Sequence, residues 1–240
     1  MATITKLGEL WDTNTGDHTV TATPAANDLI VVVHGMSGFA GSDNSTLSDN
    51  NSGGGGSYSK IGGNPLSTGG GTAGALWISI RNSLVTSATS TIFTETGTGN
   101  TGGGLTVLAV SGMARTGAMA ARQNKGESTQ TEDPPSIAFA AATLTANPIV
   151  LGVLGEDSPA GLTAPTDFAE HTDTGWSSPT TGIEVCSVNS GKTASSYSWS
   201  GGALADHNEV GVELDTTAYI IKAELEHLIS SGGMIGQKWK

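Results

Sequence analysis

Residues 29–33 read Leu-Ile-Val-Val-Val, an uninterrupted apolar run of the length of a β-strand. Two further largely apolar runs follow at residues 105–110 and 149–154. A short apolar run bounded by turn residues is typical of a strand that is covered on both faces, as in the core of a β-sandwich. These three segments therefore predict the central strands of a folded β protein.

Alternation of apolar and polar residues marks the segments around these runs. In residues 76–81, Leu76, Ile78 and Ile80 share one face, and the residues between them share the other. Residues 183–188 and 209–214 alternate in the same way. Period-two patterns of this kind indicate strands with one buried face.

The number and spacing of these segments indicate the fold class. About ten predicted strands are separated by clusters of Gly, Asn, Asp and Pro in a chain of 240 residues. This favours an all-β protein, an antiparallel β-sandwich of jelly-roll type over residues 1–216. Two stretches interrupt the rhythm: a Gly/Ser-rich loop insertion at about 37–75, and a second long connection at 115–135.

A short C-terminal helix and a tail are predicted over residues 217–240. Residues 217–230 carry an apolar stripe at helical spacing, formed by Ile220, Ile221, Leu225, Leu228 and Ile229. The stripe could pack on the chain's own sandwich or dock on a neighbouring subunit. The tail mixes apolar and basic residues that an acidic partner surface could receive: Ile235, Lys238, Trp239 and Lys240.

The charge and cysteine content narrow the possible functions. The net charge is −12 with only 10 Lys and Arg residues, which argues against nucleic-acid binding because phosphates must be neutralised by basic side chains. One cysteine excludes an internal disulfide, and neither a signal peptide nor a membrane-spanning apolar stretch is visible. A virion protein, made in the host cytoplasm and released by lysis, combines these properties, although an intracellular protein would fit as well.

Two chemical motifs suggest other functions. The strand ending in His34-Gly35 resembles the oxyanion turn of α/β-hydrolases, but no Gly-x-Ser-x-Gly elbow accompanies it. A hydrolase would need an exposed His34 beside a serine and a carboxylate. Calcium could be held by the acidic loop groups at residues 43–51 or 167–173, although both lack the ordered ligand spacing of a calcium loop.

Aromatic side chains offer a third possibility, carbohydrate binding. Trp77 and Trp199 lie in strand patterns and are expected to be packed. Trp176 lies in a Thr/Ser/Gly/Pro segment and is the best candidate for an exposed platform that contacts a sugar ring.

The order of strands and turns over about residues 17–215 resembles the jelly-roll or β-sandwich virion proteins of tailed bacteriophages. The resemblance rests on a Thr-rich strand at 19–23, the Asn-Asp-Leu-Ile-Val strand at 27–31, and the later strands at 76–81, 105–111 and 210–214. It implies a non-enzymatic structural role in capsid decoration or in the tail, without a cofactor. The implied partners are copies of the chain, in a homo-oligomer for which a trimer is the form considered, and other virion proteins such as a major capsid protein. A carbohydrate-binding module for host attachment is the alternative, and a hydrolase is the second alternative.

Overall fold

The computed structural model describes residues 1–37, 45–51, 56–66, 74–97, 102–129, 134–155, 162–176, 181–201 and 207–217. This described part contains fifteen strands, one short 3₁₀ turn and no α-helix, and all its sheets are antiparallel. None of its helices is long and apolar enough to cross a membrane. The predicted all-β fold of packed antiparallel sheets is confirmed. The predicted C-terminal helix falls almost wholly on residues from 218 onward, which lie outside the described part of the chain.

The first half of the chain forms a large sheet and a small one. The five-stranded sheet has the order β1 (Thr3–Asp12), β8 (Gly102–Ser111), β3 (Leu29–Ser37), β6 (Gly74–Arg81) and β5 (Tyr58–Leu66). The three-stranded sheet has the order β2 (His18–Ala22), β7 (Thr91–Thr96) and β4 (Thr46–Asp49). The small sheet covers one face of the large sheet through Val20 and Phe93, which pack on Ile30, Val32 and Leu105.

The second half repeats this plan. After the 3₁₀ turn η1 (Gly117–Ala120), its large sheet has the order β12 (Ala169–Trp176), β13 (Thr181–Val188), β11 (Ile149–Gly155), β15 (His207–Leu214) and β9 (Ala121–Thr129). A two-stranded sheet of β10 (Ser136–Ala138) and β14 (Ser196–Ser198) covers its outer face. Ile137 and Tyr197 of this pair pack in one apolar cluster with Leu151 and Val153.

The two halves share one strand order. In each large sheet the half's first strand is an outer strand, and it pairs with the half's last strand. The order β1-β8-β3-β6-β5 therefore matches β9-β15-β11-β13-β12, strand for strand. The small sheets correspond as well, because β2 and β7 take the places of β10 and β14. The chain is thus a tandem structural repeat, in which β4 has no counterpart among the described residues of the second half.

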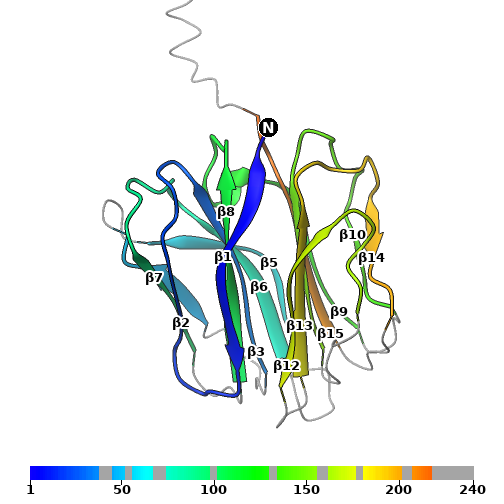
Figure 1. The fold of residues 1–240 in the computed structure, drawn as a ribbon. Coiled ribbons are helices and arrows are strands. Elements are labelled where there is room, and N and C mark those ends of the chain that lie inside the picture. The colour runs from blue at the N-terminus through cyan, green and yellow to red at the C-terminus, as the bar shows by residue number, and fades with distance from the viewer. Residues whose placement is uncertain are drawn as a thin grey trace, which may run out of the picture.

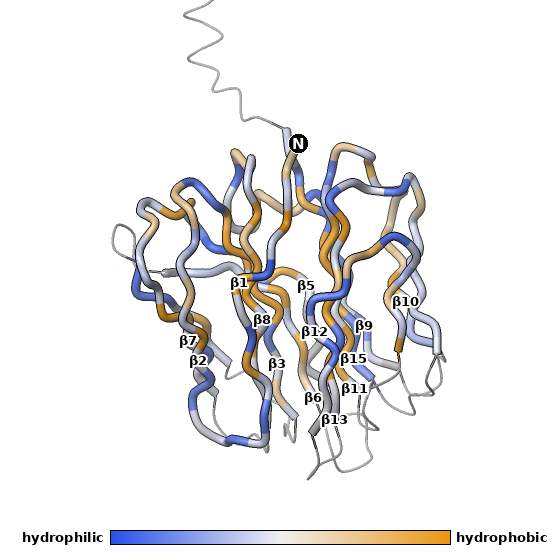
Figure 2. Tube along the Cα trace, viewed as in Figure 1, coloured by the Kyte–Doolittle hydropathy of each residue, from blue (hydrophilic) through white to orange (hydrophobic). Residues whose placement is uncertain are grey.

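The repeats stack with their large sheets face to face, which gives four layers (Figure 1). The main apolar core lies between the two large sheets and draws Leu29, Val31 and Ile78 from one and Val150 and Val212 from the other. Apolar residues are concentrated on these central strands (Figure 2). At the two sides of the stack, β1 lies beside β12 and β5 lies beside β9. The first strand of each half, β1 or β9, therefore lies beside the last strand in the order of the other half's large sheet, when that order is counted from the other half's own first strand.

Two segments predicted as long connections contain strands. Residues 37–72 include β4 and β5, and residues 115–135 include β9. Because these segments are rich in Gly and polar residues, they show no apolar pattern from which the strands could be predicted. Strand β5 is anchored by Ile61, which packs in the central core, and by Tyr58, which packs under the small sheet. Strand β9 is polar because it is an outer strand with largely half-exposed side chains.

Every outer strand of the two large sheets carries a β-bulge. The extra residues are Leu7 in β1, Gly62 in β5, Arg122 in β9 and His171 in β12. The inner pairings of both sheets run without a register shift. Bulges twist an edge and interrupt its hydrogen-bonding row, so they disfavour the addition of a further strand.

Candidate functional site

The residues predicted to make partner contacts lie mostly beyond the described part of the chain. The structure does not describe the four tail residues Ile235, Lys238, Trp239 and Lys240. Trp176 is the last residue of β12 and its backbone pairs with Thr181, but its side chain is also outside the description. Trp77 and Trp199 are 2% and 1% exposed, so the prediction that both are packed is confirmed.

Two of the acidic residues considered for calcium, Asp49 and Asp167, form ion pairs, and Asp43 lies outside the described residues. Asp49 is bonded by the Arg81 guanidinium at 2.8 Å and by the Tyr58 hydroxyl at 2.7 Å, all within the layer beneath β4. Asp167 pairs with Lys192 at 2.9 Å. Among the described residues, no group of three or more His, Cys, Asp or Glu side chains is placed to hold a metal ion.

A serine, a histidine and a carboxylate do meet at His34. Its Nε2 lies 2.8 Å from the Oγ of Ser79, and its Nδ1 lies 3.1 Å from the Oε1 of Glu95. The Ser45 hydroxyl donates to the same carboxylate oxygen at 2.9 Å. These groups come from β3, β6 and β7 and from the residue before β4, and they fill the space between the large and small sheets of the first half.

This array is sealed inside the protein. His34, Ser79 and Glu95 are each 0% exposed. Burial alone would raise the pKa of Glu95, but hydrogen bonds with His18, His34 and Ser45 outweigh it and hold the pKa below its usual value. The order of groups is that of a catalytic triad, yet the exposed His34 that a hydrolase requires is not found. The array instead satisfies buried polar groups and links the two sheets.

The second half also buries acidic side chains. His207 and Glu209 share a face of β15, with Nε2 and Oε1 3.1 Å apart, and both are buried. The backbone N–H of Ser136 in β10 donates to the same Oε1 of Glu209 at 2.7 Å. Nearby, Glu184 accepts a hydrogen bond from the Trp199 indole at 2.9 Å. Burial and the charge of Glu170 raise the pKa of Glu184 to about 8.

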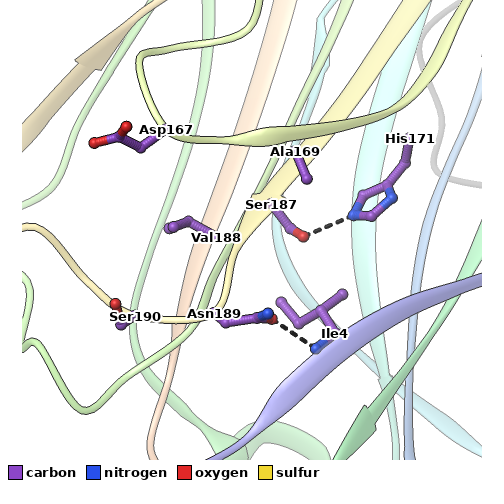
Figure 3. Close-up of a pocket in the computed structure, with 8 residues that line it drawn as sticks. All are labelled: Ile4, Asp167, Ala169, His171, Ser187, Val188, Asn189 and Ser190. Carbon is purple, nitrogen blue, oxygen red and sulfur yellow. Dashed lines mark hydrogen bonds between the residues drawn. The ribbon is translucent and has the colours of Figure 1, made fainter.

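An open pocket lies where the two repeats meet, at the side formed by β1 and β12. We call it the seam pocket (Figure 3). Its volume is about 230 Å³. Its apolar lining is Ile4, Ala169 and Val188, and its polar lining is Asp167, His171, Ser187, Asn189 and Ser190. The first half contributes Ile4 alone, so the pocket is built mainly by β12, β13 and the turn that follows β13.

Hydrogen bonds fix the polar groups of the seam pocket. The imidazole Nε2 of His171 lies 2.7 Å from the Oγ of Ser187, and the two side chains point toward one another (Figure 3). The backbone N–H of Ile4 donates to the Oδ1 of Asn189 at 2.7 Å. Burial and the neighbouring Lys6 ammonium lower the pKa of His171. The imidazole is therefore neutral at physiological pH.

Sequence reasoning missed the seam pocket. Ile4 and Asn189 are 185 positions apart, and β1 and β12 were not among the predicted strands. Asp167 was considered only as a member of the loose acidic group at 167–173, a stretch that also contains His171. The one signal in the sequence is that Asn-Ser follows the corresponding strands β6 and β13, at residues 82–83 and 189–190.

Comparisons with known proteins add little to this geometry. No protein-family model matches the chain, and no curated protein matches it. Among solved structures, it is similar to a chain titled Red Clover Necrotic Mosaic Virus, with 9% sequence identity and a TM-score of 0.19, over 92% of this chain and 99% of that chain. A TM-score of this size does not establish a shared fold, so function is inferred from the chain's own residues.

Proposed function

We propose that the protein is a non-enzymatic structural component of a virus particle, built as two jelly rolls in tandem, and that it acts by assembling with copies of itself and with other virion proteins. Capsid decoration or a tail-associated position, in a tailed bacteriophage, is the form that the sequence resemblance favours. The proposal places the protein in the virion after synthesis in the host cytoplasm.

The strand order is the observation that carries this proposal. In the first half, β1-β8-β3-β6 lies opposite β2-β7-β4. This is the jelly-roll order of eight consecutive strands, except that β5 has joined β6 in the first sheet. In the second half, β9-β15-β11-β13 lies opposite β10-β14. Viral capsid and lectin domains use this architecture, and the inference from fold to role is an analogy.

The sheet edges suggest how such a protein would assemble. All four outer strands of the large sheets carry bulges, which argues against assembly by edge-to-edge backbone pairing. Side-chain contacts by loops and by the C-terminal segment are then the favoured mode. The basic tail residues Lys238 and Lys240 suit an acidic partner, and the chain itself carries a net charge of −12.

Size-exclusion chromatography with light scattering tests the assembly proposal. The full chain is expected to form a closed homo-oligomer, with a trimer as the form first looked for, and a chain ending at Ser231 is expected to lose it. Circular dichroism of the truncated chain controls for folding. A full chain that stays monomeric at high concentration, with and without calcium, would overturn the proposal. A truncated chain that assembles normally would show that the tail is not needed for assembly.

Carbohydrate binding is the second candidate function. The jelly roll is also a lectin architecture, and the seam pocket supplies a concave surface that combines apolar and polar groups. Trp176 stays a candidate sugar platform, at the end of the same strand that carries His171.

A further inference from the structure

The seam pocket lies on the β1–β12 side of the molecule, and the repeat gives this side a counterpart. The repeat makes the β5–β9 side the counterpart of the β1–β12 side. On the β5–β9 side the bulge residue of β5 is Gly62, with φ +60, and an added β-carbon there would lie 3.2 Å from the carbonyl oxygen of Lys125. Absence of a side chain lets the two strands close together at this point.

The β1–β12 side differs at its bulge. Here the bulge residue of β12 is His171, whose ring turns to Ser187 and lines the pocket (Figure 3). The Lys6 ammonium donates to the His171 carbonyl oxygen at 2.5 Å and also pairs with Glu9. On this side the long side chains of Lys6 and His171 lie between the two repeats. On the β5–β9 side the corresponding bulge residue is Gly62, which has no side chain. Gly62 and His171 thus occupy corresponding bulge positions, at which the two repeats differ.

Two of the three non-glycine residues with a positive φ in the described part of the chain lie at or near the seam pocket, and the third is Asn27. Asp167 and Thr193 have φ values of 69° and 58°. A β-branched residue such as Thr193 rarely adopts this region. Asp167 itself forms an ion pair with Lys192, the residue that precedes Thr193. Positive-φ backbone therefore lies at or next to both members of this pair. Strained residues of this kind gather at functional sites.

The chemistry of the lining defines a ligand class. The Oδ1 of Asn189 accepts from Ile4, which orients its NH₂ group as the remaining donor. Lys192 bonds one oxygen of Asp167, and the other oxygen can accept. Because Asp167 is paired and His171 is neutral, the pocket has no strong excess of either charge. Neutral ligands with hydroxyl groups suit it better than phosphates or metal ions.

We propose that the seam pocket binds one neutral sugar ring, whose hydroxyl groups bond Asn189 and Asp167. Ile4, Ala169 and Val188 offer apolar contact to the C–H face of the ring. A volume of about 230 Å³ is below the ~300–1,000 Å³ of sites for drug-sized ligands, which limits the ligand to a single ring. This inference rests on the second candidate function, carbohydrate binding, and is independent of the assembly proposal.

Nuclear magnetic resonance of the full chain tests the proposal. Glucose, galactose, mannose and N-acetylglucosamine are titrated while the side-chain NH₂ signals of Asn189 are followed. At least one sugar is expected to shift these signals in a saturable way. Ser190→Trp, which fills the pocket, is expected to weaken binding at least tenfold. Ser198→Trp, at an exposed position of β14 in the outer layer, is the matched control and should bind as the parent does.

The outcomes separate the site from the function. No binding of any of the four sugars would overturn both the pocket assignment and the carbohydrate-binding function behind it. Binding that survives Ser190→Trp unchanged would overturn the seam pocket alone and direct attention to Trp176. Light scattering on both variants shows whether assembly is intact, so a general folding failure is recognised.

Discussion

The backbone N–H of Ile4 donates a hydrogen bond to the side-chain Oδ1 of Asn189 at 2.7 Å, and this bond joins the first strand of one repeat to the turn after β13 of the other. Ile4 is 8% exposed and also contributes its side chain to the shared core. The edge of β1 is thus tied across the stack by a side chain, in place of a neighbouring strand.

Removing this bond should loosen the contact between the repeats. Asn189→Ala removes the partner of the Ile4 N–H, and the loss of a partly buried hydrogen bond of this kind costs about 0.5–1.5 kcal/mol. Asn14→Ala, in an exposed turn where the side chain accepts from Gly16, should cost less than about 0.5 kcal/mol. Urea unfolding measures both. Equal losses for the two variants would mean that the Asn189 bond contributes nothing special.

Close approach of the two large sheets makes a second prediction. Gly152 lies in β11 at the central core, where an added β-carbon would meet Val33 at 3.0 Å and Val210 at 3.4 Å. Gly152→Leu should therefore force the sheets apart and cost about 3 kcal/mol or more. Gly16→Leu, at an exposed turn position, is the control. A Gly152→Leu protein with an unchanged unfolding midpoint would refute face-to-face stacking at this point.

The sequence predicted the central strands but not the number of layers. The runs at 29–33, 105–110 and 149–154 are indeed inner strands covered on both faces. Residues 76–81 were expected to have one exposed face, yet Trp77, Ser79 and Arg81 are all buried. Polar residues on that face pair with groups of the small sheet, as Arg81 does with Asp49. Alternation of apolar and polar residues therefore shows that the two faces of a strand differ, but not that one is exposed. In residues 76–81 the polar face lies in a buried layer between the two sheets.

The repeat and the seam pocket were beyond sequence reasoning for a physical reason. Corresponding strands keep the same order and pairing, but few corresponding residues are identical. Gly62 and His171 are both bulge residues, yet they have no chemistry in common. Strand pairing depends mainly on the backbone and on apolar burial, so it tolerates such divergence. The pocket depends on contacts between residues more than 150 positions apart, which local patterns do not reveal.

The buried pair of His18 and Glu95 predicts a dependence of stability on pH. Burial alone would lower the pKa of His18, but its bond to Glu95 and the charges of Glu95 and Asp12 outweigh this and raise it above 6.5. A raised folded pKa stabilises the fold fully below pH 6.5, and the effect is lost as pH rises through the folded value. His18→Gln should therefore cost most near pH 5.5–6 and progressively less at higher pH.

Thermal unfolding of the parent, His18→Gln, Glu95→Gln and the double variant between pH 5 and 9 checks this behaviour. Because Glu95 raises the pKa of His18, the cost of His18→Gln should lose most of its pH dependence in a Glu95→Gln background. Glu95 itself has a lowered pKa, so its own contribution is present above pH 4.5 and is lost as pH falls through the folded value. A His18→Gln penalty that is constant with pH would contradict the assignment.

Replacement of Glu184 is predicted to stabilise the protein, whereas the variants above destabilise it. Its side chain is 0% exposed, and burial together with the charge of Glu170 raises its pKa from 4.5 to about 8. Between these values the folded state holds a proton that the unfolded state has released, so stability falls as pH rises from 4.5 to about 8. Glu184→Gln keeps an oxygen to accept the Trp199 indole N–H and removes the ionisation. Its free energy of unfolding should match the parent's near pH 4.5 and exceed it by about 1–3 kcal/mol at pH 8.5. Urea unfolding at pH 4.5, 6.5 and 8.5 measures the trend, and a gap between the two proteins that does not widen with pH would show that Glu184 ionises normally in the folded protein.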